Sequence, residues 1–181
     1  MQCWFTMPDQ ERHLAHQVAE KAAAIRAVIF DVDGVLTDGR IIYTDDGREL
    51  KAFSVQDGSA IKMLINNSIE VAIITGRRST MVERRCAELG IRHLYQGIEH
   101  KKEAFEDLLT KLSLTSEQLA HVGDDLPDIP LFDLVGLAIS VPNGHPAARA
   151  RADVVTVRSG GEGVASEVCQ MLLSAHGRWP Y

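Results

Sequence analysis

The chain has 181 residues, of which 45% are hydrophobic, and this length and composition suit one α/β domain with a full core. Its formal net charge of -6 argues against a nucleic-acid partner or an anionic membrane surface, because neither polyanion attracts an acidic protein without a basic tract. No apolar run approaches the roughly 20 residues of a membrane helix, and the cysteines lack metal-like spacing, so we expect a cytoplasmic protein with free thiols.

Strand and helix signals alternate along the chain. A polar, alanine-rich helix at 9–24 leads into an apolar strand at 27–30, and an Asp-Gly turn signal then predicts a β-hairpin with arms at 40–44 and 49–55. Further helices are predicted at 58–66, 79–89, 103–112, 116–119 (capped by Ser116), 129–135, 147–152 and 163–174, and further strands at 70–74, 93–95, 121–122, 136–140 and 154–157. This alternation predicts parallel βαβ units with right-handed crossovers.

Three of these strands end in polar residues that suit one site. In order along the chain, these residues are Asp31 and Asp33, then Thr75 and Gly76, then Asp124 and Asp125 with Asp128. Ligands of open α/β folds bind at the carboxyl ends of the strands. Carboxylate oxygens suit Mg²⁺, whereas zinc is disfavoured because no cluster of cysteine and histidine is present. For the first pair alone, a solvated Asp-Gly turn is an equally good interpretation, and His121 is expected to have a surface or strand-end role.

Four motifs together resemble the haloacid dehalogenase superfamily of phosphohydrolases: Asp31-x-Asp33, Thr75, Lys101 and Gly123-Asp124-Asp125-x-x-Asp128. The resemblance implies a Rossmann-like doubly wound parallel sheet with helices on both faces. It implies that Asp31 is the nucleophile and forms an aspartyl-phosphate, and that Asp33 is the acid/base. It also implies that Mg²⁺ is held by Asp31, the main-chain carbonyl of Asp33 and Asp124.

The same resemblance gives roles to the remaining motif residues. Thr75, Gly76 and Lys101 would bind the phosphate, and the cation and Lys101 would offset its charge. Asp125 and Asp128 would hold Lys101 and metal-bound water rather than bind Mg²⁺ directly.

A narrower similarity extends from about residue 25 to residue 177. It rests on the segment 31–39, Asp57-Gly58, Thr75-Gly76-Arg77, Tyr95-Gln96-Gly97 and Gly123-Asp124-Asp125-Leu126, which look like the 3-deoxy-D-manno-octulosonate 8-phosphate phosphatases. This similarity implies a small acidic sugar phosphate as substrate, in the bacterial route to lipopolysaccharide. Arg77 would hold the substrate carboxylate, since its planar fork can bind one bidentately, and Asp57 and Gly58 would also bind substrate.

Two alternatives stay open. A nonulosonate 9-phosphate phosphatase is disfavoured by Arg77, because those relatives tend to carry glutamate there, but Glu162 and Ser166 keep it open. A non-catalytic, oligomer-forming regulatory domain is disfavoured because the motif residues are intact.

The spacing of the motifs leaves no room for a cap domain. The resemblance therefore implies a capless hydrolase domain at 25–177, preceded by an extension and helix at 1–24 and followed by a short tail at 178–181. The hairpin at 40–55 would protrude, and its apolar residues would pack against other subunits of a homotetramer. Without the resemblance, packing of these apolar residues on their own domain is the preferred interpretation. Residues 1–6 are expected to be disordered, with Met7 as an alternative start.

Overall fold

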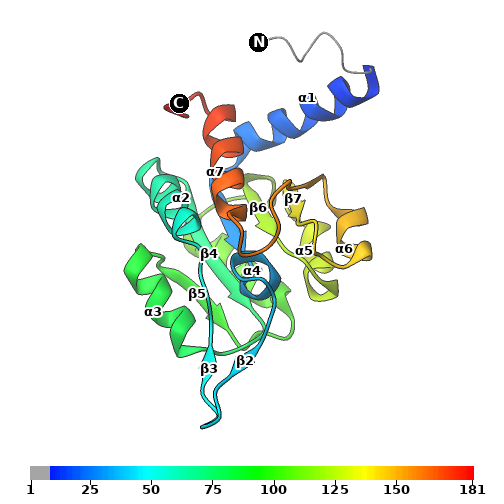
Figure 1. Ribbon diagram of the computed structural model, residues 1–181. Helices are drawn as coiled ribbons and strands as arrows, with labels where there is room; N and C mark the ends of the chain where they lie inside the picture. Colours follow the sequence, from blue (N-terminus) through cyan, green and yellow to red (C-terminus); the bar gives the residue numbers. More distant parts are fainter. Residues whose placement is uncertain (1–8) are drawn as a thin grey trace.

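The computed structural model describes residues 9–181, so the expectations for residues 1–6 and Met7 lie outside the described residues (Figure 1). The helices are α1 Asp9–Ala24, α2 Val55–Asn66, α3 Thr80–Leu89, α4 Lys101–Leu112, α5 Ile129–Phe132, α6 Pro146–Arg151 and α7 Val164–Ala175. The strands are β1 Ala27–Phe30, β2 Ile42–Tyr43, β3 Glu49–Leu50, β4 Glu70–Thr75, β5 His93–Gln96, β6 Leu119–Val122, β7 Leu137–Ser140 and β8 Val154–Val155. Within 9–181, no helix combines the length and the apolar character needed to cross a membrane.

Six strands form one parallel sheet in the order β5-β4-β1-β6-β7-β8. The chain builds outward from β1 through β4 to β5 and then returns to β6 on the other side of β1. Such a switch in direction opens a crevice at the carboxyl ends of the strands. The predicted doubly wound α/β fold is confirmed, and the predicted site lies at this end of the sheet.

Both faces of the sheet are covered by helices. Val28 and Phe30 of β1 belong to a core that includes side chains of α2, α3 and α7, whereas Ala27 and Ile29 pack with Phe105 of α4 and with α5. Successive side chains of a strand point to opposite faces, so a strand buried on both faces is apolar throughout. All four residues of β1 are fully buried, which anchors the loop that follows.

Several predicted boundaries differ from the structure by a few residues, and at two of them a capping side chain gives the reason. Val55 begins α2 instead of ending the hairpin, because Ser54 caps the helix by accepting a hydrogen bond from the amide of Asp57 at 3.4 Å. The short 3₁₀ turn at Ser116–Gln118 is capped by Thr115 rather than Ser116, since Thr115 and Gln118 form a reciprocal capping box.

The hairpin β2–β3 projects from the body of the molecule (Figure 1). Between Asp33 and Thr75 the chain forms only this hairpin, α2 and β4, and no cap domain is inserted. Ile42, Tyr43 and Leu50 are 47%, 64% and 50% exposed, so the hairpin leaves apolar side chains uncovered in the single chain.

The C-terminal tail packs on its own domain. The amide of Trp179 donates to the carbonyl of Leu173 at 3.2 Å, and its indole is partly buried against the core. The guanidinium of Arg178 donates to the carbonyl of Asn67 at 2.7 Å, which ties the tail to the end of α2.

Candidate active site

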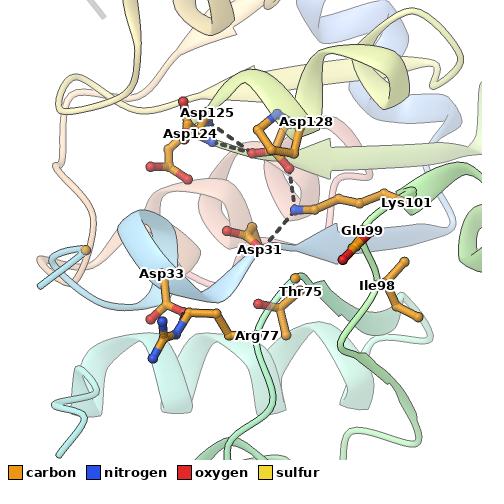
Figure 2. A pocket seen from close by; sticks show the side chains of 13 residues that line it. Asp31, Asp33, Thr75, Arg77, Ile98, Glu99, Lys101, Asp124, Asp125 and Asp128 are labelled. Atoms are coloured by element: carbon orange, nitrogen blue, oxygen red, sulfur yellow. Dashed lines mark hydrogen bonds and ion pairs between the residues drawn. The ribbon is translucent and has the colours of Figure 1, made fainter. Parts of the chain in front are cut away.

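The loops after β1, β4, β5 and β6 enclose one cavity of about 510 Å³ at the carboxyl end of the sheet (Figure 2). Its lining combines predicted and unpredicted residues: Asp31, Asp33, Gly39, Thr75, Gly76, Arg77, Ile98, Glu99, Lys101, Asp124, Asp125, Pro127 and Asp128. Nine of the eleven predicted site residues therefore meet here, although they come from separate segments of the chain.

Asp31 occupies the floor of the cavity. Its amide donates to the carbonyl of Val122 at 3.0 Å, which extends the pairing of β1 with β6 by one residue. A wide helical turn, Val32–Leu36, follows at once and bends the chain away from the sheet. The side chain of Asp31 is thus left at the strand end, 11% exposed.

Gly34 lets this turn approach the loop that carries Asp124. Its φ of +98° lies in the left-handed region that favours glycine. A Cβ added there would lie 2.1 Å from Oδ2 of Asp124, so a larger residue would displace that carboxylate. The glycine of the Asp-x-Asp-Gly motif is therefore required by the close approach of two loops.

Lys101 joins two carboxylates in the wall of the cavity. It begins α4, its side chain is 5% exposed, and its Nζ lies 2.9 Å from Oδ1 of Asp31 and 2.6 Å from Oδ1 of Asp128 (Figure 2). Burial lowers the pKa of Lys101, but attraction from Asp31 and Asp128 outweighs it and the pKa is raised. Lys101 is therefore a fixed positive charge beside the Asp31 carboxylate.

Asp128 has both carboxylate oxygens occupied. Oδ1 accepts from Lys101 and from Nε2 of His121 at 2.9 Å, and Oδ2 accepts from the amides of Asp124 at 3.0 Å and Asp125 at 3.1 Å. Burial would raise the pKa of Asp128, but the hydrogen bonds and charges of His121 and Lys101 lower it well below its usual range. Asp128 is thus an ionised carboxylate engaged by four protein donors.

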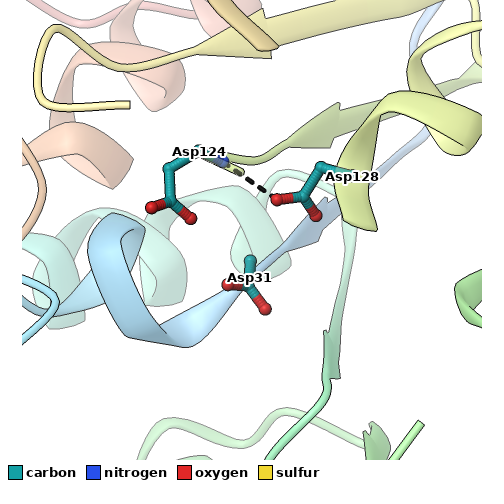
Figure 3. Close-up of side chains that lie close together, drawn as sticks. All are labelled: Asp31, Asp124 and Asp128. Atoms are coloured by element: carbon teal, nitrogen blue, oxygen red, sulfur yellow. Dashed lines mark hydrogen bonds between the residues drawn. The ribbon is translucent and has the colours of Figure 1, made fainter. Parts of the chain in front are cut away.

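Asp31, Asp124 and Asp128 come close enough to suggest a metal site, with one oxygen of each within 4.8 Å of the others (Figure 3). Because Asp128 is already engaged, Asp31 and Asp124 are the pair that could hold a cation. Burial, followed by repulsion from Asp31, Asp128 and Asp125, raises the pKa of Asp124 to about 7. Crowded, oxygen-only ligands with an excess of negative charge fit a hard divalent cation such as Mg²⁺.

Asp33 lies at the rim with charged residues from two other segments. Its carboxylate is paired with Lys51 of the segment after β3, and Arg77 Nε lies 3.7 Å from its Oδ2. Glu49 completes the cluster, since its carboxylate lies 3.2 Å from Lys51 and 3.3 Å from Arg77. Glu49 and Lys51 were not predicted as site residues, because alternating charges in a hairpin ordinarily face solvent.

Thr75 and Gly76 reach the cavity from the end of β4, as predicted. Thr75 is the last residue of β4 and is 2% exposed, and Gly76 follows it into the loop. A Cβ at Gly76 would meet only the carbonyl of Ile98, at 3.8 Å, so the position is open rather than crowded.

Three predicted residues depart from their expected places. Asp57 and Gly58 do not line the cavity: Asp57 is 3% exposed, and its Oδ1 accepts from the amide of Ser166 at the start of α7, 3.1 Å away. Both are therefore packing positions of α2, and we withdraw their assignment to substrate binding. Asp125 lines the cavity but does not hold Lys101; its carboxylate instead caps the next turn through the amide of Leu126 at 2.8 Å.

Two further residues hold the surroundings of the site together. His121 is completely buried instead of lying at the surface, and only the tertiary structure brings it to Asp128. Asn143 donates to the carbonyl of Gly34 at 3.0 Å and accepts from the amide of Gly160 at 2.7 Å. It thereby joins the turn after Asp31 to a loop more than a hundred residues away, a connection with no local sequence signal.

Comparisons with known proteins agree with this geometry. A family model described as haloacid dehalogenase-like hydrolase matches residues 94–168. The chain is 53% identical to 3-deoxy-D-manno-octulosonate 8-phosphate phosphatase KdsC of Escherichia coli (strain K12), over 89% of this chain and 86% of that protein.

Solved structures give the same result. The phosphatase of the same name from Yersinia pestis superposes with a TM-score of 0.88 at 47% identity, covering 90% of this chain and 88% of that one. The one from Moraxella catarrhalis, solved in complex with a magnesium ion, a phosphate ion and a KDO molecule, gives a TM-score of 0.88 at 45% identity and covers 90% and 93% of the two chains.

Proposed function

The chain belongs to the 3-deoxy-D-manno-octulosonate 8-phosphate phosphatases of the haloacid dehalogenase superfamily, and we infer that it hydrolyses this phosphomonoester to KDO and inorganic phosphate with Mg²⁺ as cofactor. The observation that carries the proposal is the arrangement of Lys101 between Asp31 and Asp128, with Asp124 opposite, in one cavity. The Asp31 carboxylate is paired with Lys101 and also faces the cavity, where a phosphoryl group can enter.

In the first step, an Asp31 oxygen attacks phosphorus and the bond to the sugar oxygen breaks. Asp33 gives a proton to the leaving alkoxide. In the second step, Asp33 takes a proton from water, and this water attacks the phospho-aspartate, which releases phosphate and restores the Asp31 carboxylate. Splitting the displacement in this way replaces one difficult step by two easier ones.

Charge is the main obstacle, because a phosphate dianion must approach a carboxylate. Lys101 supplies a positive charge that the structure already holds beside Asp31, and Thr75 and the Gly76 amide lie where they can donate to phosphoryl oxygens. Asp31, Asp124 and the main-chain carbonyl of Asp33 would hold Mg²⁺, which neutralises negative charge on the phosphoryl group when bound.

Arg77 is the basic residue of the rim that suits the substrate carboxylate. It is 41% exposed in its side chain and already faces Asp33 and Glu49, so it can exchange these partners for a carboxylate of the sugar acid. The test is a comparison of kcat/KM for octulosonate 8-phosphate, nonulosonate 9-phosphates and p-nitrophenyl phosphate in the presence of Mg²⁺. Preference for a nonulosonate would replace the substrate assignment, and cleavage of p-nitrophenyl phosphate alone would remove it.

We also propose that the protein acts in the cytoplasm as a homotetramer, in the synthesis of the lipopolysaccharide sugar. The exposed Ile42, Tyr43 and Leu50 of the hairpin support self-association, because a monomer would leave them in water. Light scattering after size-exclusion chromatography tests this, with Ile42→Lys as the perturbing variant. A monomeric wild-type protein at micromolar concentration would refute it.

A further inference from the structure

A buried histidine lies behind the Lys101–Asp128 pair. His121 is the third residue of β6, has no exposed surface and does not line the cavity, so it cannot touch the substrate. Its neighbours on the adjacent strands are Ile29 and Ala138, and its ring packs against Phe132 with the centroids 5.5 Å apart. An imidazole in such surroundings is costly to bury unless it is hydrogen-bonded, so packing alone does not explain its presence.

The imidazole is aimed at one atom of the site. Nε2 lies 2.9 Å from Oδ1 of Asp128, whereas Nδ1 has no hydrogen-bond partner among residues 15–181, whose side chains the structure describes. Because a carboxylate oxygen only accepts, Nε2 carries the hydrogen and donates it to Asp128. Hydrogen bonds to a charged acceptor are shorter and stronger than those between neutral groups.

This bond restrains the oxygen of Asp128 that the backbone amides leave free. The amides of Asp124 and Asp125 both end on Oδ2 of Asp128, so they hold one oxygen and let the carboxylate turn about it. Oδ1 is the atom that receives Lys101 at 2.6 Å, and the fully buried imidazole donates to this same atom. With Oδ1 fixed, the ammonium group of Lys101 is directed to Asp31, 2.9 Å away.

We propose that His121 is a positioning residue, which fixes the Asp128 carboxylate and thereby keeps Lys101 aimed at the nucleophile Asp31. The proposal rests on the proposed phosphatase function, and it adds a residue from the core of the sheet to that site. His121 acts through Asp128 and Lys101 and makes no contact with the reacting atoms.

The main test compares three variants with the wild type on both octulosonate 8-phosphate and p-nitrophenyl phosphate. His121→Phe keeps the ring and removes the donor, and we expect kcat to fall by about 10- to 100-fold at saturating Mg²⁺ with little change in KM. His121→Gln places an amide donor near the position of Nε2 and is expected to restore most of the loss. His121→Asn places its donor near the position of Nδ1, too far from Asp128, and is expected to behave like His121→Phe.

The outcomes separate a positioning role from a purely structural one. Equal kcat values for the Gln and Asn variants would overturn the proposal, as would a loss of thermal stability in His121→Phe with kcat unchanged. The Gln and Asn pair decides the matter even where the Phe variant does not fold. If the wild-type protein cleaves only p-nitrophenyl phosphate, the substrate assignment is refuted. The kcat values of the His121 variants on p-nitrophenyl phosphate still test the positioning role.

A second measurement does not depend on turnover. In the metal-free protein, urea unfolding of His121→Phe, Asp128→Ala and the double variant gives the coupling between the two side chains, because alanine leaves no acceptor for the imidazole. We expect the histidine substitution to shift the unfolding midpoint clearly in the wild-type background and little in the Asp128→Ala background. Equal shifts in both backgrounds would show that His121 does not act through Asp128.

Discussion

Replacing Lys101 by methionine tests the electrostatics of the site directly. The substitution keeps most of the apolar stem and removes a charge that lies 2.9 Å from Asp31 and 2.6 Å from Asp128. At an effective dielectric constant of about 20, each of these pairs corresponds to roughly 6 kcal/mol of attraction, most of which offsets the cost of burying the charges. Removing one member of a buried ion pair costs about 3–5 kcal/mol, because the remaining charge is left uncompensated.

We therefore expect Lys101→Met to lower the free energy of unfolding of the metal-free protein by about 3 kcal/mol at pH 7.5. The pKa of Asp31 is already raised by burial, and the loss of the Lys101 charge raises it further. A carboxyl group with a raised folded-state pKa contributes more to stability as the pH falls through that pKa. The deficit of the variant should consequently be smaller at pH 5.5 than at pH 7.5.

Urea unfolding followed by circular dichroism at the two pH values measures this effect. Lys102→Met is the matched control, since the neighbouring lysine is 62% exposed and lies 3.8 Å from Glu106 on the same helix. We expect a change below about 0.5 kcal/mol for the control. A Lys101→Met deficit below about 1 kcal/mol at pH 7.5, or one that grows toward pH 5.5, would refute the assigned ion-pair network.

Three further substitutions probe the site. Asp31→Asn should lower kcat at least about 10³-fold in a phosphate-release assay while the circular dichroism spectrum stays unchanged, and turnover near the wild-type rate would exclude Asp31 as nucleophile. Gly34→Ala places a Cβ 2.1 Å from Oδ2 of Asp124 and should displace that carboxylate. Calorimetry should then show that the Kd for Mg²⁺ is raised about 10-fold or more. An unchanged Kd would mean that Asp124 does not hold the cation. Asp57→Ala removes the acceptor of the Ser166 amide and should lower the free energy of unfolding by about 1–3 kcal/mol. Its kcat/KM should stay within about threefold of the wild-type value. A large loss of kcat/KM in a folded variant would restore a substrate-binding role for Asp57.

Local patterns were sufficient for most of the elements. The apolar run at Ala27–Phe30 identified a strand buried on both faces, and the polar residues directly after three strands placed the site at one edge of the sheet. Boundaries failed where a neighbouring side chain competed for the same cap, as with Thr115 and Ser116. The outcome of such competition depends on a single hydrogen bond, and the hydrophobic periodicity of the sequence does not indicate it.

The amino-acid sequence by itself determined the fold class and the residues at the strand ends, because hydrophobic periodicity and the order of strands and helices are local properties of the chain. Tertiary structure alone decided what lies behind and beside those residues. His121 reaches Asp128 from inside the sheet, Lys51 reaches Asp33 from the hairpin, and Asp57 turns toward α7 instead of the cavity. The physical reason is that a buried polar side chain must find its partners in space, and these partners come from elements that only the packing of the whole domain brings together.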